Sequence, residues 1–181
     1  ISSGNYVDNM CFTYSNGWFP VSPIYWADSQ TKADFYCYSP YSSNIENVKE
    51  YIFSINADQS KFDAYKASDF LWGKSVNNTS SSNPVNIQVS HLMSRLVVKL
   101  VAGNGYSDND LNDAEVIICS MQNEAVINLS NGATTPSGFV EEVVPYMDND
   151  DYCALLVPQT ISNSDFVKVT IGGQTYVLKQ S

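Results

Sequence analysis

The sequence has few basic residues and a single histidine. Lysine and arginine together number 9, against 19 aspartates and glutamates, which gives a formal net charge of -10. A surface of this sign repels the phosphates of nucleic acid and anionic lipid headgroups, so neither is an expected partner. Any catalytic triad or Cys-His pair would have to use His91, and no nucleophile-elbow or protease signature surrounds it. We therefore expect a structural position for His91, at a sheet edge or between two domains, and no catalytic residue.

Motifs for cofactors and metals are also missing. The sequence contains no Walker loop, no G-x-G-x-x-G and no G-x-S-x-G. Its four cysteines show no C-x-x-C spacing, which argues against a zinc site and thioredoxin-like chemistry. No run of about 18 apolar residues occurs, so no segment is long enough to cross a membrane as a helix. We expect no cofactor-binding residue, no metal ligand and no transmembrane segment.

One acidic loop has part of a calcium-binding pattern. Asp108, Asp110 and Asn112 alternate as the first ligands of an EF-hand do. Asp113 stands where that loop requires glycine, and Cys119 stands where it requires a bidentate glutamate, so an EF-hand is excluded. The sequence favours a solvated loop here over an irregular calcium site.

Other carboxylates do not form a recognisable catalytic pair. Glu141 and Glu142 are consecutive, so they point to opposite faces of a strand. A glycosidase needs two carboxyl groups about 5–9 Å apart in a cleft, and no such pair is indicated. The acidic tip at residues 148–151 is interpreted as a solvated turn.

Three of the cysteines lie in apolar strand-like runs, namely Cys37, Cys119 and Cys153. Free cysteine is among the most buried residue types, so the favoured interpretation is three small core residues. A disulfide between Cys119 and Cys153 is the alternative if their strands are adjacent.

The longest strand pattern covers residues 90–101. Leu92, Leu96, Val98 and Leu100 alternate with a second set made of Met93, Arg95, Val97 and Lys99. This period of two places the two sets on opposite faces and predicts a long strand that forms the spine of a β-sheet core.

Shorter strand patterns flank this segment on both sides. Asn16-Gly17 and Gly172-Gly173 predict tight hairpins. A short helix, capped by Ser60, is expected within residues 60–72, and a polar, mobile loop within 74–83. Strands are expected at 10–14, 18–26, 33–38, 48–55, 114–119, 125–129, 139–144, 152–157, 166–171 and 174–178.

The spacing of these strands predicts the fold class. Short strands about ten residues apart, without amphipathic helices between them, indicate an all-β antiparallel sandwich. Their number exceeds that of one seven-stranded sandwich, so two packed β-domains are expected. We place them at residues 1–104 and 105–181, with the boundary uncertain by about ten residues.

Aromatic side chains gather in the first quarter of the chain, including Trp18, Trp26 and Tyr36. Cross-strand pairing and core filling are the favoured explanation. The alternative is a carbohydrate-binding surface, because aromatic platforms bind the faces of sugars.

Several segments resemble, in order, the fimbrillin (Mfa-like, type V pilin) family of Bacteroidales. The resemblance covers about 160 residues and rests on Y-W-A-D, A-D-F-Y-C-Y-S-P-Y, S-D-F-L-W, P-V-N-I-Q-V-S-H-L-M-S-R-L-V-V-K-L, A-V-I-N-L-S-N-G, Y-C-A-L-L-V-P-Q-T-I and V-T-I-G-G-Q-T-Y, at residues 25–28, 33–41, 68–72, 84–100, 125–132, 152–161 and 169–176.

The resemblance implies two transthyretin-like Greek-key β-sandwich domains and export as a lipoprotein to the outer membrane. It also implies a non-enzymatic role as a structural or adhesive fimbrial subunit. Relatives have further strands before the position of Tyr6 and one more strand after the match to residues 176–179, so terminal strands are expected to be missing here. The resemblance then implies assembly with other fimbrial subunits by donor-strand exchange, with host proteins or glycans as further partners. The alternative function is a surface glycan-binding lipoprotein that uses the N-terminal aromatic residues.

Overall fold

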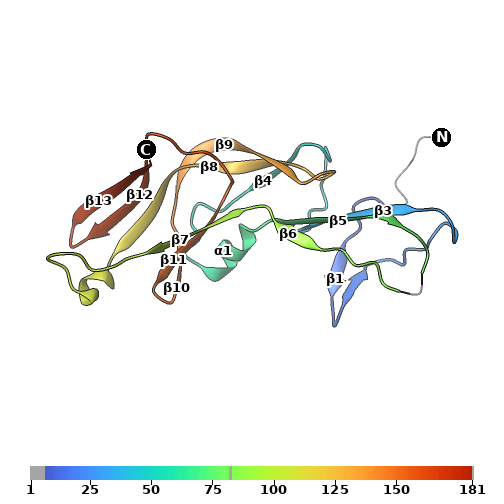
Figure 1. Cartoon of the computed structure of the whole chain (residues 1–181), viewed down its shortest axis with the longest axis horizontal. Coiled ribbons are helices and arrows are strands. Elements are labelled where there is room, and N and C mark those ends of the chain that lie inside the picture. The colour runs from blue at the N-terminus through green and yellow to red at the C-terminus, as the bar shows by residue number, and fades with distance from the viewer. Residues whose placement is uncertain (1–6, 82, 181) are drawn as a thin grey trace.

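The computed structural model describes residues 7–81 and 83–180 and shows an elongated, all-β molecule (Figure 1). In chain order the elements are β1 (Phe12–Tyr14), β2 (Trp18–Pro20), β3 (Ala33–Ser39), β4 (Tyr51–Ser54), α1 (Phe62–Ala67), β5 (Leu71–Asn78), β6 (Val89–His91), β7 (Ser94–Lys99), the 3-10 turn η1 (Asp108–Leu111), β8 (Glu115–Asn128), β9 (Ala133–Val143), β10 (Tyr146–Asp148), β11 (Asp151–Leu156), β12 (Ser164–Ile171) and β13 (Gln174–Gln180).

The largest sheet is built around β8, a strand of 14 residues. β9 pairs antiparallel with β8 from Ile118 to Asn128, and so occupies one edge of it. On the other edge, the first half of β8 pairs with β12 and the second half pairs with β4. β13 extends this sheet beyond β12. A bulge in β8 at Ser120, which has a φ of 61°, lies between the half that pairs with β12 and the half that pairs with β4.

A second sheet, in the order β10-β11-β7, packs against the first. The main hydrophobic core lies between them, because alternate residues of β8 and β11 point toward each other. Residues 152–157 of β11 and its end are all buried, and the Gln59 side chain bonds the backbone of Leu155 there. The buried core cluster comprises Phe53, Ile55, Phe70, Met93, Val116, Ile118, Met121, Ala125, Ile127, Leu129, Val143, Tyr152, Ala154, Leu156, Val157 and Val167.

The N-terminal part is a thinner structure. It consists of the sheet β3-β5-β6 and the separate β1-β2 hairpin, which lie together at one end of the molecule (Figure 1). None of the residues from 7 to 50 is buried. Tyr38 of β3 joins this part to the main core: its ring stacks on Phe70 at a centroid distance of 5.9 Å and lies 6.0 Å from the ring of Tyr51 in β4.

The predicted spine at residues 90–101 is wrong as one strand. Leu92 and Met93 interrupt it between β6 and β7, and the Leu92 N–H donates to the Phe70 carbonyl at 2.7 Å. This break turns Met93 into the core, where it is 6% exposed, whereas Arg95, Val97 and Lys99, with which alternation grouped it, are exposed. Leu92, Leu96, Val98 and Leu100 pack against the core.

Other differences follow from tertiary pairing that local patterns do not show. The predicted strands at 114–119 and 125–129 are parts of one strand, β8, because β9 pairs across the bulge between them. The polar segment expected to be a loop at 74–83 begins with β5, which lies between β3 and β6. Lys61 occupies the helix N-cap position in place of Ser60, and no side chain caps α1.

Both predicted hairpins are present. Gly172 and Gly173 form a two-residue turn with φ values of 56° and 78°. Asn16-Gly17 belongs to a three-residue loop, because Tyr14 pairs with Trp18. Strand pairing also crosses the predicted domain boundary: β4 pairs with β8 and β7 pairs with β11. The division at 104/105 stays a prediction.

Candidate assembly site

Strand β7 has a free edge. It pairs with β11 along one side, and no strand of the described residues lies along the other. Its six residues include no proline, and its pairing with β11 runs without a register shift. The outer edge of β9, by contrast, is interrupted by Pro136 and by a bulge near Gly138. β7 is therefore a regular edge, with backbone N–H and C=O groups placed to accept another strand.

An apolar surface is left uncovered on the inner side of the hairpin β12-β13. Val167 pairs with Leu178, and Val169 pairs with Tyr176, so all four side chains point to the core side of the sheet. Val167 is 4% exposed, whereas Leu178 is 62% and Tyr176 is 49% exposed. The core thus ends beneath β12, and the inner face of β13 has no layer over it.

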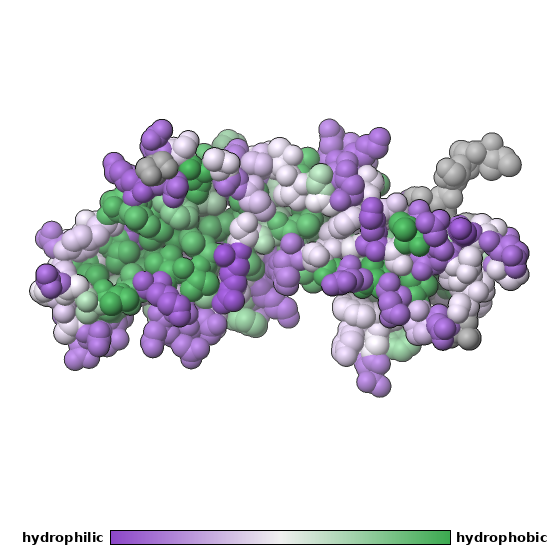
Figure 2. Space-filling model, in the orientation of Figure 1, coloured by the Kyte–Doolittle hydropathy of each residue, from purple (hydrophilic) through white to green (hydrophobic). Residues whose placement is uncertain are grey.

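On the facing sheet, Leu96 and Val98 of β7 point inward and are half-buried. We call Leu96, Val98, Val169, Tyr176 and Leu178 the open face. Figure 2 shows a broad apolar area on this half of the molecule, over the region of β7, β12 and β13. Exposed apolar area of this kind in a folded protein indicates a surface that another element covers.

The loop between β7 and β8 contacts the open face. The Tyr106 and Tyr176 hydroxyls form a hydrogen bond of 2.6 Å, and their rings meet edge to face. The Asp110 carboxylate of this loop accepts hydrogen bonds from the backbone N–H and the hydroxyl of Ser107, which lower the pKa of Asp110. The acidic loop at residues 108–113 is therefore stabilised by hydrogen bonds between its own residues, Ser107 and Asp110. Among residues 7–81 and 83–180, no three His, Cys, Asp or Glu side chains could hold a metal ion together.

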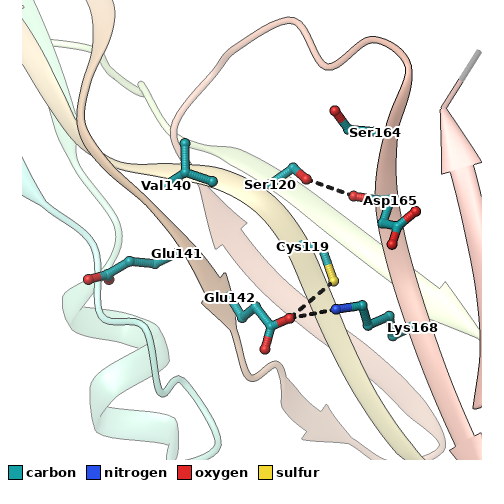
Figure 3. Close-up of a pocket in the computed structure, with 8 residues that line it drawn as sticks. All are labelled: Cys119, Ser120, Val140, Glu141, Glu142, Ser164, Asp165 and Lys168. Carbon is teal, nitrogen blue, oxygen red and sulfur yellow. Dashed lines mark hydrogen bonds and ion pairs between the residues drawn. The ribbon is translucent and has the colours of Figure 1, made fainter.

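A shallow cavity of about 390 Å³ lies on the outer side of the large sheet, next to the β8 bulge (Figure 3). Glu142 points into it and accepts a 2.8 Å hydrogen bond from Lys168, whereas Glu141 points away, as predicted for consecutive strand residues. The ion pair lowers the pKa of Glu142 and raises the pKa of Lys168. A lysine held protonated in this way is a poor nucleophile.

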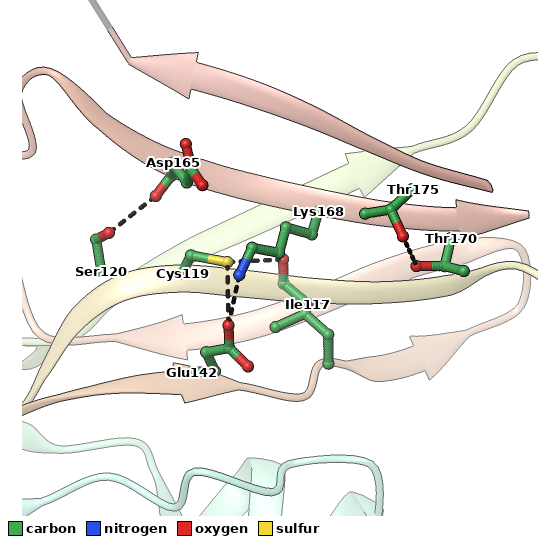
Figure 4. Close-up of polar contacts among 8 residues, drawn as sticks. All are labelled: Ile117, Cys119, Ser120, Glu142, Asp165, Lys168, Thr170 and Thr175. Carbon is green, nitrogen blue, oxygen red and sulfur yellow. Dashed lines mark hydrogen bonds and ion pairs between the residues drawn. The ribbon is translucent and has the colours of Figure 1, made fainter. Parts of the chain in front are cut away.

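The Cys119 thiol lies beside this ion pair, 3.8 Å from a Glu142 oxygen (Figure 4). Burial raises the pKa of Cys119, so the thiol stays protonated. Ser120 turns its hydroxyl to the Asp165 carbonyl at 2.9 Å, which ties β8 to the start of β12. These contacts fix the bulge, and none of them prepares a nucleophile.

The cysteine prediction is confirmed for two positions. Cys119 and Cys153 are 3% and 1% exposed, and both are free thiols. They belong to β8 and β11, which lie in different sheets, and this arrangement does not support the alternative disulfide. Cys37 is half-buried.

His91 ends the edge strand β6, where its Nδ1 lies 2.7 Å from a carboxylate oxygen of Asp69. The imidazole is 70% exposed and contacts no thiol or hydroxyl in the described residues. The geometry is that of a surface hydrogen bond between β6 and the segment that follows α1.

The N-terminal aromatic residues include a cross-strand pair, as predicted, since Tyr14 and Trp18 are paired across β1 and β2 with ring centroids 5.4 Å apart, but they depart from the core-filling interpretation. Trp18 and Tyr36 are 66% and 50% exposed, and Trp26 is half-buried against Phe35 at a ring distance of 5.7 Å. These side chains therefore remain accessible to a ligand.

A model of the fimbrillin-like family matches residues 1–181. The chain belongs to the fimbrillin-like family. No curated protein matches it. The longest helix of the described residues is the six-residue α1, and none is long and apolar enough to cross a membrane.

Solved structures of Bacteroides proteins share the fold of this fimbrillin-like chain. A candidate cell adhesion protein of Bacteroides uniformis is 21% identical with a TM-score of 0.69, and the match covers 90% of this chain and 62% of that one. A candidate cell adhesion protein of Bacteroides ovatus is 20% identical with a TM-score of 0.65, and the match covers 89% of this chain and 63% of that one. A third candidate cell adhesion protein, from Bacteroides thetaiotaomicron, is 15% identical with a TM-score of 0.57, and the match covers 95% of this chain and 69% of that one. The chain thus spans less than two thirds of the length of the first two.

The sequence did not point to the open face, although part of its signal was visible. The Gly172-Gly173 turn predicted the β12-β13 hairpin, and alternation placed Tyr176 and Leu178 on one side of it. Which strands face that side depends on the pairing of β7 with β11, and nothing local to residues 164–180 encodes this pairing.

Proposed function

We propose that the chain is a non-enzymatic fimbrial subunit or adhesin of the cell surface that assembles by donor-strand exchange. Membership of the fimbrillin-like family supports the pilus or adhesion role. The observation that carries strand addition is the free edge of β7 beside the uncovered, core-facing side chains of β13. An added strand would gain main-chain hydrogen bonds along β7 and would bury Tyr176 and Leu178 with its alternate side chains.

The proposed occupant is a terminal strand of another fimbrial subunit. Two transthyretin-like domains, export as a lipoprotein and attachment to the outer membrane by a lipid anchor outside this sequence complete the proposal. They follow from the family resemblance, and metabolic labelling of the full-length protein with a radioactive fatty acid tests the anchor.

Strand addition is tested with a synthetic peptide that carries a partner subunit's terminal strand. We expect the melting temperature to rise with peptide concentration, because a ligand that binds the folded state stabilises it by about 2.7 kcal/mol at 100 times its dissociation constant. A peptide with the same composition in scrambled order is the control. The same melting temperature at saturating peptide would overturn the proposal.

Two matched variants of β13 locate the binding surface. Leu178→Lys places a charge on the open face, whereas Val177→Lys places one on the opposite side of the same strand, where Val177 is 42% exposed. We expect Leu178→Lys to weaken peptide binding about tenfold or more, since it buries a charge, and Val177→Lys to leave it unchanged. Equal effects of the two substitutions would place the strand elsewhere.

A second candidate is glycan binding by the N-terminal aromatic residues. The exposure of Trp18 and Tyr36 favours it, because each ring keeps accessible surface on which a sugar could stack, although the Trp18 ring also meets Tyr14 edge to face at 5.4 Å. Glycan-array binding that is lost in Trp18→Ala would support this candidate, and an unchanged array profile would exclude Trp18 from it.

A further inference from the structure

A second cavity, of about 560 Å³, lies where the N-terminal sheet meets the turn between β8 and β9. One wall is the face of β5 and β6 that carries Trp72, Lys74 and Ser90, and the other is the turn residue pair Asn131-Gly132. Gln88 and Leu92 complete the lining. We call this the Trp72 groove.

Strand register explains why these side chains share one face. Trp72 pairs with Ser90 across β5 and β6, and Tyr36 of β3 pairs with Lys74. Directly paired residues of antiparallel strands point the same way, as do residues two apart along one strand. The half-exposed ring of Tyr36 therefore extends the same face beyond Lys74.

Two glycines allow the groove to form. A Cβ on Gly132 would lie 2.7 Å from the Trp72 ring, and a Cβ on Gly73 would lie 2.3 Å from the Gln88 carbonyl. The Trp72 indole N–H also donates to the Leu129 carbonyl at 2.8 Å. The indole is therefore held in one position at the wall of the groove, half-buried, with its remaining surface open.

Three polar side chains of the groove are unused within the described residues, whereas the Asn131 side-chain oxygen accepts from the Ala133 N–H at 2.9 Å and leaves its NH₂ group as a donor. The side chains of Lys74, Gln88 and Ser90 are exposed and make no hydrogen bond or ion pair there. No aspartate or glutamate lines the groove. It therefore combines one aromatic ring, hydrogen-bonding side chains and a single uncompensated positive charge.

We propose that the Trp72 groove binds a short saccharide that carries one carboxylate. The indole would take the apolar face of a sugar ring, Gln88, Ser90 and Asn131 would bond its hydroxyl groups, and Lys74 would pair with the carboxylate. The net charge of -10 disfavours polyanionic glycans, whereas a single carboxylate suits a single lysine. This proposal deepens the glycan-binding candidate: it places the sugar on the face that carries Trp72, Lys74 and Tyr36, and not on Trp18 of the β1-β2 hairpin. It does not depend on strand addition.

The test uses the whole chain with 3′-sialyllactose, which has one carboxylate, and lactose, its neutral counterpart. Saturation-transfer NMR and titration should detect both sugars, with tighter binding of sialyllactose. We expect Lys74→Gln to weaken sialyllactose binding about tenfold and to leave lactose unchanged. Gln88→Ala should weaken both sugars. Lys49→Gln removes an exposed lysine outside the groove and is the matched control.

Because Lys74, Gln88 and Lys49 are exposed, the variants should keep the parent melting temperature, which is measured first. The absence of saturation transfer to both sugars would overturn the proposal. Binding that survives both Lys74→Gln and Gln88→Ala, or that disappears in Trp18→Ala, would also overturn it. Loss of binding in Trp18→Ala would at the same time support the β1-β2 hairpin as the glycan site. The strand-peptide test is independent, so its failure would not change the interpretation of the sugar-binding measurements.

Discussion

Two glutamine side chains, the buried Gln59 and the half-buried Gln159, take the place of a backbone partner where strands separate. Gln59 accepts from the Leu155 N–H at 2.9 Å and donates to the Leu155 carbonyl at 2.8 Å, much as a neighbouring strand would. Gln159 bonds both backbone groups of Gln122 in the same way, close to the β8 bulge. Backbone groups that would otherwise be unpaired inside the protein are satisfied by these amides.

Gln59→Ala should destabilise the protein by about 3 kcal/mol, because it leaves the backbone groups of Leu155 without partners in a buried site. Gln59 is fully buried. Urea unfolding measures the change, with the exposed Gln30→Ala as control. Equal midpoints for the two variants would show that water replaces the lost amide.

Lys168→Met should raise the pKa of Glu142, since Lys168 is the main cause of its lowered value. The folded-state pKa lies below the ordinary value, so the stabilisation by this pair is present at neutral pH and is lost as the pH falls through the lowered pKa. An NMR titration of the Glu142 side chain measures the shift in each variant.

Lys179→Met is the control for this titration. Lys179 pairs with Asp165 at 3.5 Å, so its removal should leave Glu142 unchanged. A Glu142 pKa that moves equally in both variants would indicate a general charge effect in place of the specific pair.

At the residue scale, sequence predicted a side chain correctly where its environment depends only on its own chemistry and its neighbours along the chain. Cys119 and Cys153 are buried as their apolar surroundings indicated, and consecutive Glu141 and Glu142 diverge. The roles of Gln59 and Gln159 could not be predicted, because each depends on a backbone group brought close by folding.

At the scale of elements, the β8-β9 turn joins the large sheet to the N-terminal sheet through Trp72. Gly132 has a φ of 77° and would bring a Cβ within 2.7 Å of the indole. Gly105 has a φ of 91° but no atom within 4 Å of such a Cβ. Both positions have a backbone conformation that side chains other than glycine rarely adopt, but only at Gly132 would an added Cβ meet a neighbouring side chain.

Gly132→Ala should therefore be more destabilising than Gly105→Ala. Both carry the cost of a left-handed conformation, about 1 kcal/mol, and Gly132→Ala adds the displacement of the indole. Denaturant midpoints report the loss of stability, and the NMR signal of the Trp72 indole N–H reports the displacement of the ring. Equal loss of stability in both variants would mean that the turn moves away without cost.

The sequence predicted where most strands lie. It predicted less well where each strand begins and ends and which strand it pairs with. Period-two alternation located β3, β11, β12 and β13 within a few residues, and Gly172-Gly173 located their last turn. The pattern failed at β5, whose asparagine and serine residues suit a loop but lie between two other strands. Long-range pairing overrode local preference there.

At the scale of the whole molecule, burial is unevenly distributed. The cluster of buried side chains spans residues 53–167, whereas residues 7–50 contain none. Regions with few buried contacts open with lower free energies than the core. The all-β class follows from the sequence, but this difference between the two ends does not, because it depends on which strands face each other.

Hydrogen exchange should reveal this difference. We expect the amides of β1 and β2 to exchange at denaturant concentrations where those of β8 and β11 remain protected. Native-state exchange followed by mass spectrometry measures both in one sample. Uniform protection across the chain would show that the N-terminal part unfolds together with the core.

The length of β8 has a mechanical consequence. β8 and β9 run side by side in the direction of the molecule's greatest extent (Figure 1), and their ladder continues for most of the 14 residues of β8. A pull in that direction loads the ladder in shear, so its hydrogen bonds resist together. The three-residue β1-β2 ribbon, which pairs with no other strand between residues 7 and 180 as described, would instead peel apart one bond at a time.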